Sequence, residues 1–384
     1  MSKRVYPLLS DRKFVERLRV MMQALTDTPL SAEGKAVAAH SFCSGIIQEI
    51  STVIQLKKGG IILDEEFLYE LVISGWGKTL GQYIDIKSIE GFEVMDHETL
   101  RLTQLAIRTG SALFAIYYII REGYQRFYIS IHHALADEHT LMIIRDLVQV
   151  ASAGGMDLAL HNMRQGRQLY NSYVERQLIE AKDDSVLSMR CNQTMTPLRL
   201  SETGRLAWSI RAKRITLHRI VQIEPVNNEK KQPTEEVILK MLCNTTNVVR
   251  EGNTVCSSHN WRLSHESRAV GMMTGLLAIP FGWKKYAPYN LKVSLEACAR
   301  HSSVFREALA CCRASELFIN GAVSRGIPAS QVISSTFPVG IEIKHINPSE
   351  IRLEIEGTLC SRAAVADLLN ELTDVLSNRR KQNG

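Results

Sequence analysis

The chain has 384 residues, of which 45% are hydrophobic and 22% are charged, and its formal net charge is +6. This length suits one large domain or two medium ones, with a sizeable buried core. The charge is only mildly basic and no apolar stretch is long enough to span a membrane, so we expect a cytoplasmic protein that binds neither nucleic acid nor membrane.

The first half of the chain alternates between helical and strand-like patterns. The predicted elements are a helix within about the first 25 residues, a strand at 46–56, a helix that follows Asp64, two hairpin strands at 112–120 and 126–131, and a helical run through 141–148. Glycine in the loop between the two hairpin strands favours a tight turn. This half therefore predicts a mixed α and β lobe.

The second half repeats this mixed character after a weakly patterned crossover. The crossover contains a predicted helix around 169–181. The predicted elements after it are a strand within 206–223, a helix from 233 to 242, strands at 254–263 and 351–355, and a closing helix at 363–376. We therefore expect an N-terminal lobe at 1–160, a crossover at 161–205 and a C-terminal lobe at 206–384.

The most informative motif follows the strand Phe127–Ile131, where the chain reads His132-His133-Ala-Leu-Ala-Asp137. An imidazole at the end of a rigid strand, with a carboxylate close behind, is suited to take a proton from a hydroxyl or an amine. A packed histidine pair without chemistry is the alternative. A metal site is disfavoured, because adjacent residues on a strand point to opposite faces and no further ligands cluster nearby.

The eight cysteines are scattered and form no Cys-x-x-Cys pair. They indicate neither a zinc site nor a disulfide framework, and reduced thiols are the simplest interpretation.

Residues 110–137 resemble the core of the superfamily that contains chloramphenicol acetyltransferase, nonribosomal peptide condensation domains and polyketide-associated acyltransferases. Four further segments are similar in order: Tyr6-Pro7-Leu8, Ile62-Leu63-Asp64 at a strand-to-helix step, Asn260-Trp261-Arg262 at a strand end, and Ile333-Ser334-Ser335-Thr336 before Gly340. Only the His-His-x-x-x-Asp turn is a specific motif, whereas the other matches are of order and pattern.

The resemblance implies a mixed α/β fold of two chloramphenicol acetyltransferase-like lobes that form a pseudo-dimer with a tunnel between them. It also implies a freestanding condensation-type acyltransferase, in which His133 deprotonates a small-molecule hydroxyl or amine that attacks a thioester. The donor would be an acyl or peptidyl carrier protein or an acyl-CoA, and the product an ester or amide of secondary metabolism. We expect a monomer without a permanently bound cofactor, because the thioester is carried on phosphopantetheine.

The resemblance also assigns roles to individual residues. Asp137 would be structural and pair with Arg262, and His132 would orient or pack. A hydroxyl of the loop Ser334, Ser335 and Thr336 could face the oxyanion, although such a loop is more often only a turn. Trp283, in Pro280-Phe281-Gly282-Trp283, could line the channel.

Glu138 departs from the family pattern, which usually has glycine directly after the aspartate. If the backbone there needed a positive φ, glutamate would be costly, so either the turn is relaxed or Glu138 has a role. Two alternatives to acyl transfer therefore stay open. The chain could be an inactive module that binds carrier proteins, or an enzyme for dehydration, epimerisation or cyclisation of a tethered intermediate.

A basic stretch could bind the phosphate of a phosphopantetheine arm, but a solvated face is the favoured interpretation. Its residues are Arg205, Arg211, Lys213, Arg214, His218 and Arg219.

Overall fold

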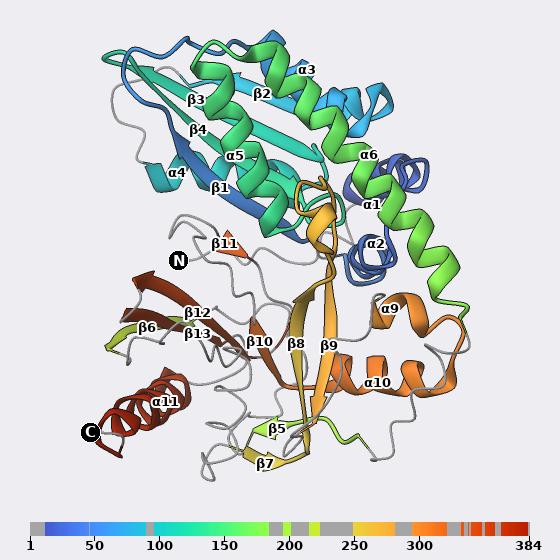
Figure 1. Ribbon diagram of the computed structural model, residues 1–384, viewed down its shortest axis with the longest axis vertical. Coiled ribbons are helices and arrows are strands. Elements are labelled where there is room, and N and C mark those ends of the chain that lie inside the picture. Colours follow the sequence, from blue (N-terminus) through green and yellow to red (C-terminus); the bar gives the residue numbers. More distant parts are fainter. Residues whose placement is uncertain are drawn as a thin grey trace. The chain divides into compact units, whose positions relative to one another are not determined.

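The computed structural model describes residues 12–45, 47–89, 96–183, 195–200, 215–222, 249–280, 294–320, 332–333, 337, 339–347, 350–357 and 362–382. The chain forms two compact units (Figure 1). Unit 1 comprises Met1–Ile179, Arg262–Met273 and Ile327–Ser334, and unit 2 comprises Glu180–Trp261, Thr274–Gly326 and Ser335–Gly384.

A five-stranded sheet with the order β11-β1-β4-β3-β2 organises unit 1. Its strands are β1 (Glu49–Gln55), β2 (Ile84–Ser88), β3 (Phe114–Arg121), β4 (Tyr124–His132) and β11 (Val332–Ile333). β2 and β3 are parallel, and the other neighbours are antiparallel. Glu122 and Gly123 join β3 to β4 with positive φ angles of 52° and 79°. Two positive φ values make a type I′ turn, whose twist matches the flanking strands.

Helices cover both faces of this sheet. The helices of unit 1 are α1 (Arg12–Thr26), α2 (Ala32–Ser44), α3 (Glu65–Trp76), α4 (Asp96–Arg108), α5 (Glu138–Ser152) and α6 (Met156–Glu180), and its short 3₁₀ turns are η2 (Lys78–Tyr83) and η3 (Ser264–Glu266).

The two sheet faces differ in polarity. Residues of α3, α5 and α6 line one small apolar cavity together with Ile129 and Ile131 of β4. Ser130 lies between these two residues, so its side chain points to the opposite face. There its hydroxyl forms a hydrogen bond of 2.8 Å with the hydroxyl of Thr103 on α4. The α4 face of β4 is therefore partly polar, and the α3, α5 and α6 face is apolar.

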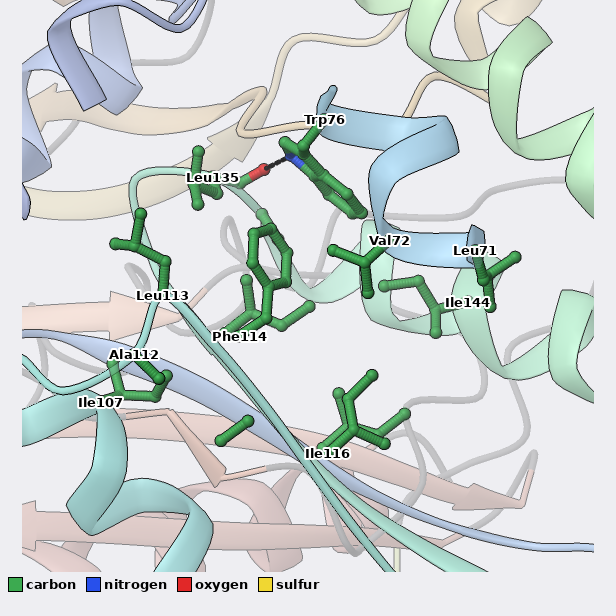
Figure 2. Close-up of a cluster of buried hydrophobic side chains, with 14 of the residues drawn as sticks. Leu71, Val72, Trp76, Ile107, Ala112, Leu113, Phe114, Ile116, Leu135 and Ile144 are labelled. Atoms are coloured by element: carbon green, nitrogen blue, oxygen red, sulfur yellow. Dashed lines mark hydrogen bonds between the residues drawn. The ribbon is translucent and has the colours of Figure 1, made fainter. Parts of the chain in front are cut away.

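Figure 2 shows the apolar packing at the end of β3 nearest the histidine turn. Val72 of α3, Phe114 of β3 and Ile144 of α5 point toward one another, and Trp76 lies over Phe114 with 4.8 Å between the ring centroids. A buried aromatic pair of this kind contributes about 0.5–1.5 kcal/mol beyond its area burial. The turn after β4 therefore rests on a rigid base.

A six-stranded sheet with the order β6-β13-β12-β10-β8-β9 organises unit 2. Its strands are β6 (Ile215–Gln222), β8 (Thr254–Asn260), β9 (Thr274–Pro280), β10 (Leu317–Asn320), β12 (Val339–Asn347) and β13 (Glu350–Gly357), and a small second sheet pairs β5 (Arg199–Leu200) with β7 (Val249–Glu251). The helices are α9 (Leu295–Cys298), α10 (Ser303–Ala314) and α11 (Arg362–Gln382). Val365, Leu368 and Leu372 of α11 share a core with Ile343 and Leu353.

The expected mixed α/β class is confirmed, with a multistranded sheet in each unit. The first helix, the hairpin, the helix after the histidine turn, β13 and α11 lie where the sequence pattern places them, within a few residues. The predicted helix at 233–242 lies outside the described residues.

Several differences from the sequence-based expectations concern unit 1. The pattern does not predict α2 or α4, and Ile62-Leu63 precedes α3 as a loop rather than as a strand. The helix expected around 169–181 begins at Met156 as α6, so the expected lobe boundary at residue 160 falls inside a helix. The segment Arg262–Met273, expected in the C-terminal lobe, is part of unit 1.

Candidate active site

The histidine turn connects the end of β4 to the start of α5, and its backbone is contacted by Gln48, which precedes β1, by α3 and by α2. The His133 amide donates to the Gln48 carbonyl at 2.9 Å. The Trp76 indole donates to the Leu135 carbonyl at 3.1 Å (Figure 2). Gly34 of α2 packs so closely that an added Cβ would lie 2.6 Å from the Ala134 carbonyl oxygen. Glycine is therefore required there, and the turn has little freedom.

The hydrogen bond of His133 fixes which ring nitrogen is available for chemistry. Its Nδ1 lies 3.0 Å from the Ala136 carbonyl oxygen, and since a carbonyl only accepts, Nδ1 carries the proton. In the neutral ring, Nε2 then keeps its lone pair. The side chain is partly exposed, and within the described part of the chain no residue forms a hydrogen bond with Nε2.

The pKa of His133 also favours the neutral base. Burial lowers this pKa, and the hydrogen bond to Ala136 and the nearby Asp137 carboxylate oppose the decrease only in part. The pKa therefore lies below the ordinary histidine value of about 6.5, and the ring is unprotonated at neutral pH.

His132 has the opposite tautomer and is fully buried. The Ala134 amide donates to its Nδ1 at 3.1 Å, so Nδ1 carries no proton and the neutral ring is protonated on Nε2. Burial, and secondarily the neighbouring His133, lower the pKa of His132 to about 3. His132 therefore stays neutral and stabilises the turn from within.

We expect this low pKa to make the free energy of unfolding fall on mild acidification. Unfolded His132 takes up a proton near pH 6.5, whereas folded His132 does so only near pH 3. The unfolded chain therefore binds more protons between these values, and lowering the pH from 7 to 5 costs about 2 kcal/mol through this residue. Urea unfolding at pH 7 and pH 5 measures this loss of stability. The loss should be smaller by about 2 kcal/mol in His132→Asn than in the wild type. An equal pH dependence in both proteins would rule out this origin.

Asp137 caps α5 and binds Arg262 in a buried ion pair. Its Oδ1 accepts from the Thr140 amide at 3.0 Å and from Arg262 Nη2 at 2.9 Å, and its Oδ2 accepts from Arg262 Nη1 at 2.6 Å and from the Met273 amide at 3.0 Å. Burial by itself would raise the pKa of Asp137, but the guanidinium and these hydrogen bonds lower it well below the usual range. The carboxylate is thus fully occupied and faces the scaffold, which suits a structural role rather than proton transfer.

The segment Arg262–Met273 joins unit 1 through further buried contacts. Arg262 Nη2 also donates to the carbonyls of Ala269 and Gly271 at 3.1 and 3.0 Å, and Thr140 Oγ1 donates to Gly271 at 2.9 Å. Glu266 pairs with Arg176 of α6 at 2.8 Å. These contacts fix residues 90 or more positions apart in sequence behind the histidine turn.

Glu138 is the first residue of α5, and Asp137 before it is the N-cap. Among the described residues, Glu122 is the only non-glycine with a positive φ, so Glu138 imposes no such strain. An acidic side chain in the first turn of a helix is also favourable, because it faces the positive end of the helix dipole. The glutamate is therefore compatible with an intact turn.

We accordingly expect Glu138→Gly to lower the free energy of unfolding by about 1 kcal/mol, through weaker helix propensity and loss of the charge. Glu138→Gln keeps the side chain and should cost only about 0.5 kcal/mol. Urea denaturation of the two variants measures both values. A glycine variant more stable than the wild type would reveal backbone strain at this position.

Most of the other residues singled out from the sequence lie outside the described ranges. These are Ser334, Ser335, Thr336 and Trp283, together with Arg205, Arg211, Lys213 and Arg214. His218 and Arg219 are exposed on β6. Within the described ranges, no group of three or more histidine, cysteine or acidic side chains is arranged to hold a metal ion. None of the helices there combines the length and hydrophobicity that crossing a bilayer requires.

Comparison with known proteins gives no match to a family model and none to a curated protein sequence. Solved structures do match. The starter condensation domain of rhizomide synthetase RzmA, in complex with C8-CoA and Leu-SNAC, aligns over 93% of this chain and 96% of its own, with a TM-score of 0.56 and 10% identity. The epimerization domain from the third module of tyrocidine synthetase B aligns over 89% and 96%, with a TM-score of 0.55 and 10% identity. VibH, a condensation enzyme, aligns over 91% and 96%, with a TM-score of 0.54 and 12% identity.

This chain has the condensation-domain fold. Alignment over about nine tenths of both chains includes both units, so the likeness is not limited to the hairpin and its histidine turn. The mixed α/β architecture expected from the sequence is therefore that of the condensation-domain fold.

Within this condensation-domain fold, the residues that hold the turn are difficult to identify from the sequence. Ser31 followed by Glu33, with glycine at position 45, is the usual start and stop of a helix and could have identified α2 and hence Gly34. Gln48 acts through its backbone carbonyl, which any residue possesses, and so has no sequence signature.

Proposed function

We propose that this chain is a condensation-type acyltransferase with His133 as its general base. The observation that carries the proposal is the hydrogen bond from His133 Nδ1 to the Ala136 carbonyl, which leaves the Nε2 lone pair available. The lowered pKa keeps that lone pair unprotonated at neutral pH. A solved structure of the same fold in complex with C8-CoA and Leu-SNAC supports thioesters as the substrate class.

The reaction would proceed in two steps. Nε2 takes the proton from the acceptor hydroxyl or amine as its oxygen or nitrogen bonds to the thioester carbonyl carbon, and the carbonyl oxygen becomes an oxyanion. The oxyanion then collapses, the carbon–sulfur bond breaks, and the imidazolium returns the proton to the leaving thiolate. The products are an ester or amide and a free phosphopantetheine thiol, and the ring is again neutral.

The donor in this proposal is an acyl or peptidyl carrier protein or an acyl-CoA, and the acceptor is a small molecule in secondary-metabolite biosynthesis. Alignment of the two substrates would supply much of the remaining acceleration.

The test is intact-mass spectrometry of a carrier protein loaded with an octanoyl group, and of octanoyl-CoA in parallel, incubated with the chain and either an amine or an alcohol acceptor. The variants are His133→Ala and, as a matched control, His161→Ala, which removes an exposed histidine of α6. We expect loss of the acyl mass and formation of the ester or amide with the wild type and the control only.

Other outcomes identify the alternatives. Carrier protein that is retained without losing its acyl group would contradict acyl transfer and indicate a binding module. Loss of one water from the tethered acyl group, or inversion of a tethered aminoacyl group without release, would indicate dehydration or epimerisation instead. Transfer that persists in His133→Ala would refute His133 as the base.

A further inference from the structure

Glu49 lies directly opposite His132 in the sheet of unit 1. The two residues are register partners in the antiparallel pair of β1 and β4. Directly opposite residues on neighbouring strands place their side chains on the same face, here the face covered by α4. Both side chains are almost completely buried, with exposed fractions of 1% and 0%.

Each of these two side chains has one polar atom without a hydrogen-bond partner among the described residues. On His132 it is Nε2, which carries the proton because Nδ1 accepts from the Ala134 amide. On Glu49 it is Oε2. A buried donor or acceptor without a hydrogen bond is destabilising, so we expect each of these two atoms to have a partner.

The pairing of Glu49 with α4 explains why Oε2 is left over. Arg108, at the end of α4, directs both its Nε, at 3.0 Å, and its Nη2 to Oε1 of Glu49. A guanidinium more often binds a carboxylate with one N–H to each oxygen. This one-sided arrangement leaves Oε2 as a buried acceptor on the face that carries His132.

We propose that Glu49 is a positioning residue for the histidine turn: its Oε2 accepts the Nε2 proton of His132 through one buried bridging water. The acceptor holds His132 in the Nε2-protonated tautomer, which frees Nδ1 for the Ala134 amide. The opposite tautomer would set an N–H of the ring against that amide and distort the turn. By keeping the turn undistorted, Glu49 also holds the Ala136 carbonyl in the position where it accepts from His133 Nδ1.

The consequence for catalysis rests on the proposed function, but the tautomer does not, so the test has two separate readouts. The first is the ring N–H signal of His132 in the full chain labelled with ¹⁵N-histidine, assigned by its loss in His132→Asn. The second is kcat and KM for transfer from the octanoyl-loaded carrier protein. If no transfer is found with any protein, the proposed function fails while the spectra still decide this inference.

Three variants separate the acceptor from the ion pair. Glu49→Gln keeps an acceptor oxygen, so the protected Nε2 proton should persist and kcat should stay within about threefold. Glu49→Leu removes the acceptor, so that proton should exchange rapidly and kcat should fall roughly 10- to 100-fold at constant KM. Arg108→Met removes only the cation, so the His132 signal should not change.

Two results would overturn the proposal. One is an Nδ1-protonated or rapidly exchanging His132 in the wild type, which is decisive even if Glu49→Leu does not fold. The other is a His132 signal that does not distinguish the variants of Glu49. The signal would then be unchanged in folded Glu49→Leu, or would be lost equally in Glu49→Gln and Glu49→Leu.

Discussion

Arg262→Met is expected to lower the free energy of unfolding by about 3–5 kcal/mol, because it leaves the carboxylate of Asp137 buried without its cation. The two side chains are 3% and 1% exposed, so water cannot replace the lost partner. The substitution also removes the donor to the carbonyls of Ala269 and Gly271. Urea denaturation monitored by tryptophan fluorescence measures the loss.

A second substitution tests whether the buried charge is the cause. Asp137→Asn keeps a good N-cap for α5 but is neutral, so the double variant Asp137→Asn with Arg262→Met should be more stable than Arg262→Met alone. Lys87→Met is the control, since it breaks the half-exposed pair with Asp85 and should cost at most about 1 kcal/mol. A cost below 1 kcal/mol for Arg262→Met, or no recovery in the double variant, would contradict the account.

His133→Ala is expected to lower kcat for acyl transfer roughly 10²- to 10⁴-fold, the usual contribution of a positioned general base. KM should change little, because the base acts on the proton in the transition state rather than on binding. Steady-state kinetics at pH 7.5 measure both constants, and unchanged far-UV circular dichroism confirms that the variant is folded. Since the side chain is partly exposed and its one hydrogen bond is local, the fold should tolerate the change.

The pH profile of the wild type gives the same residue a second test. Burial lowers the pKa of His133 below 6.5, and the base is active only when unprotonated. kcat/KM should therefore rise with pH along a limb whose midpoint lies below 6.5 and be level at pH 7. A midpoint above 7 would mean that another group is the base. A value of kcat/KM that does not change with pH in this range would mean the same.

The local chemistry of the turn could be predicted from the sequence, because it depends on neighbours in the chain. The alternation of Phe127–Ile131, the two histidines and the apolar run after Asp137 predict the strand, the turn and the helix that the structure has. The choice between His132 and His133 came from resemblance rather than from pattern. The structure adds a physical reason: opposite tautomers and unequal burial of the two rings.

The long-range supports of the turn could not be predicted from the sequence pattern alone. The pairing of Asp137 with Arg262 joins residues 125 positions apart, and one chain without that resemblance offers no reason to choose this arginine. Glu49 carries no sequence signal either, since a glutamate at the start of a strand is usually solvated. Only the register of β1 with β4 brings it opposite His132.

His133 is held with Nδ1 protonated and with the Nε2 lone pair available to accept a proton. ¹⁵N chemical shifts of His133 across a pH titration, assigned with His133→Ala, test this claim without a substrate. We expect the Nδ1-protonated tautomer at pH 7 and a titration midpoint below 6.5. An Nε2-protonated ring at pH 7, or a midpoint above 6.5, would contradict it.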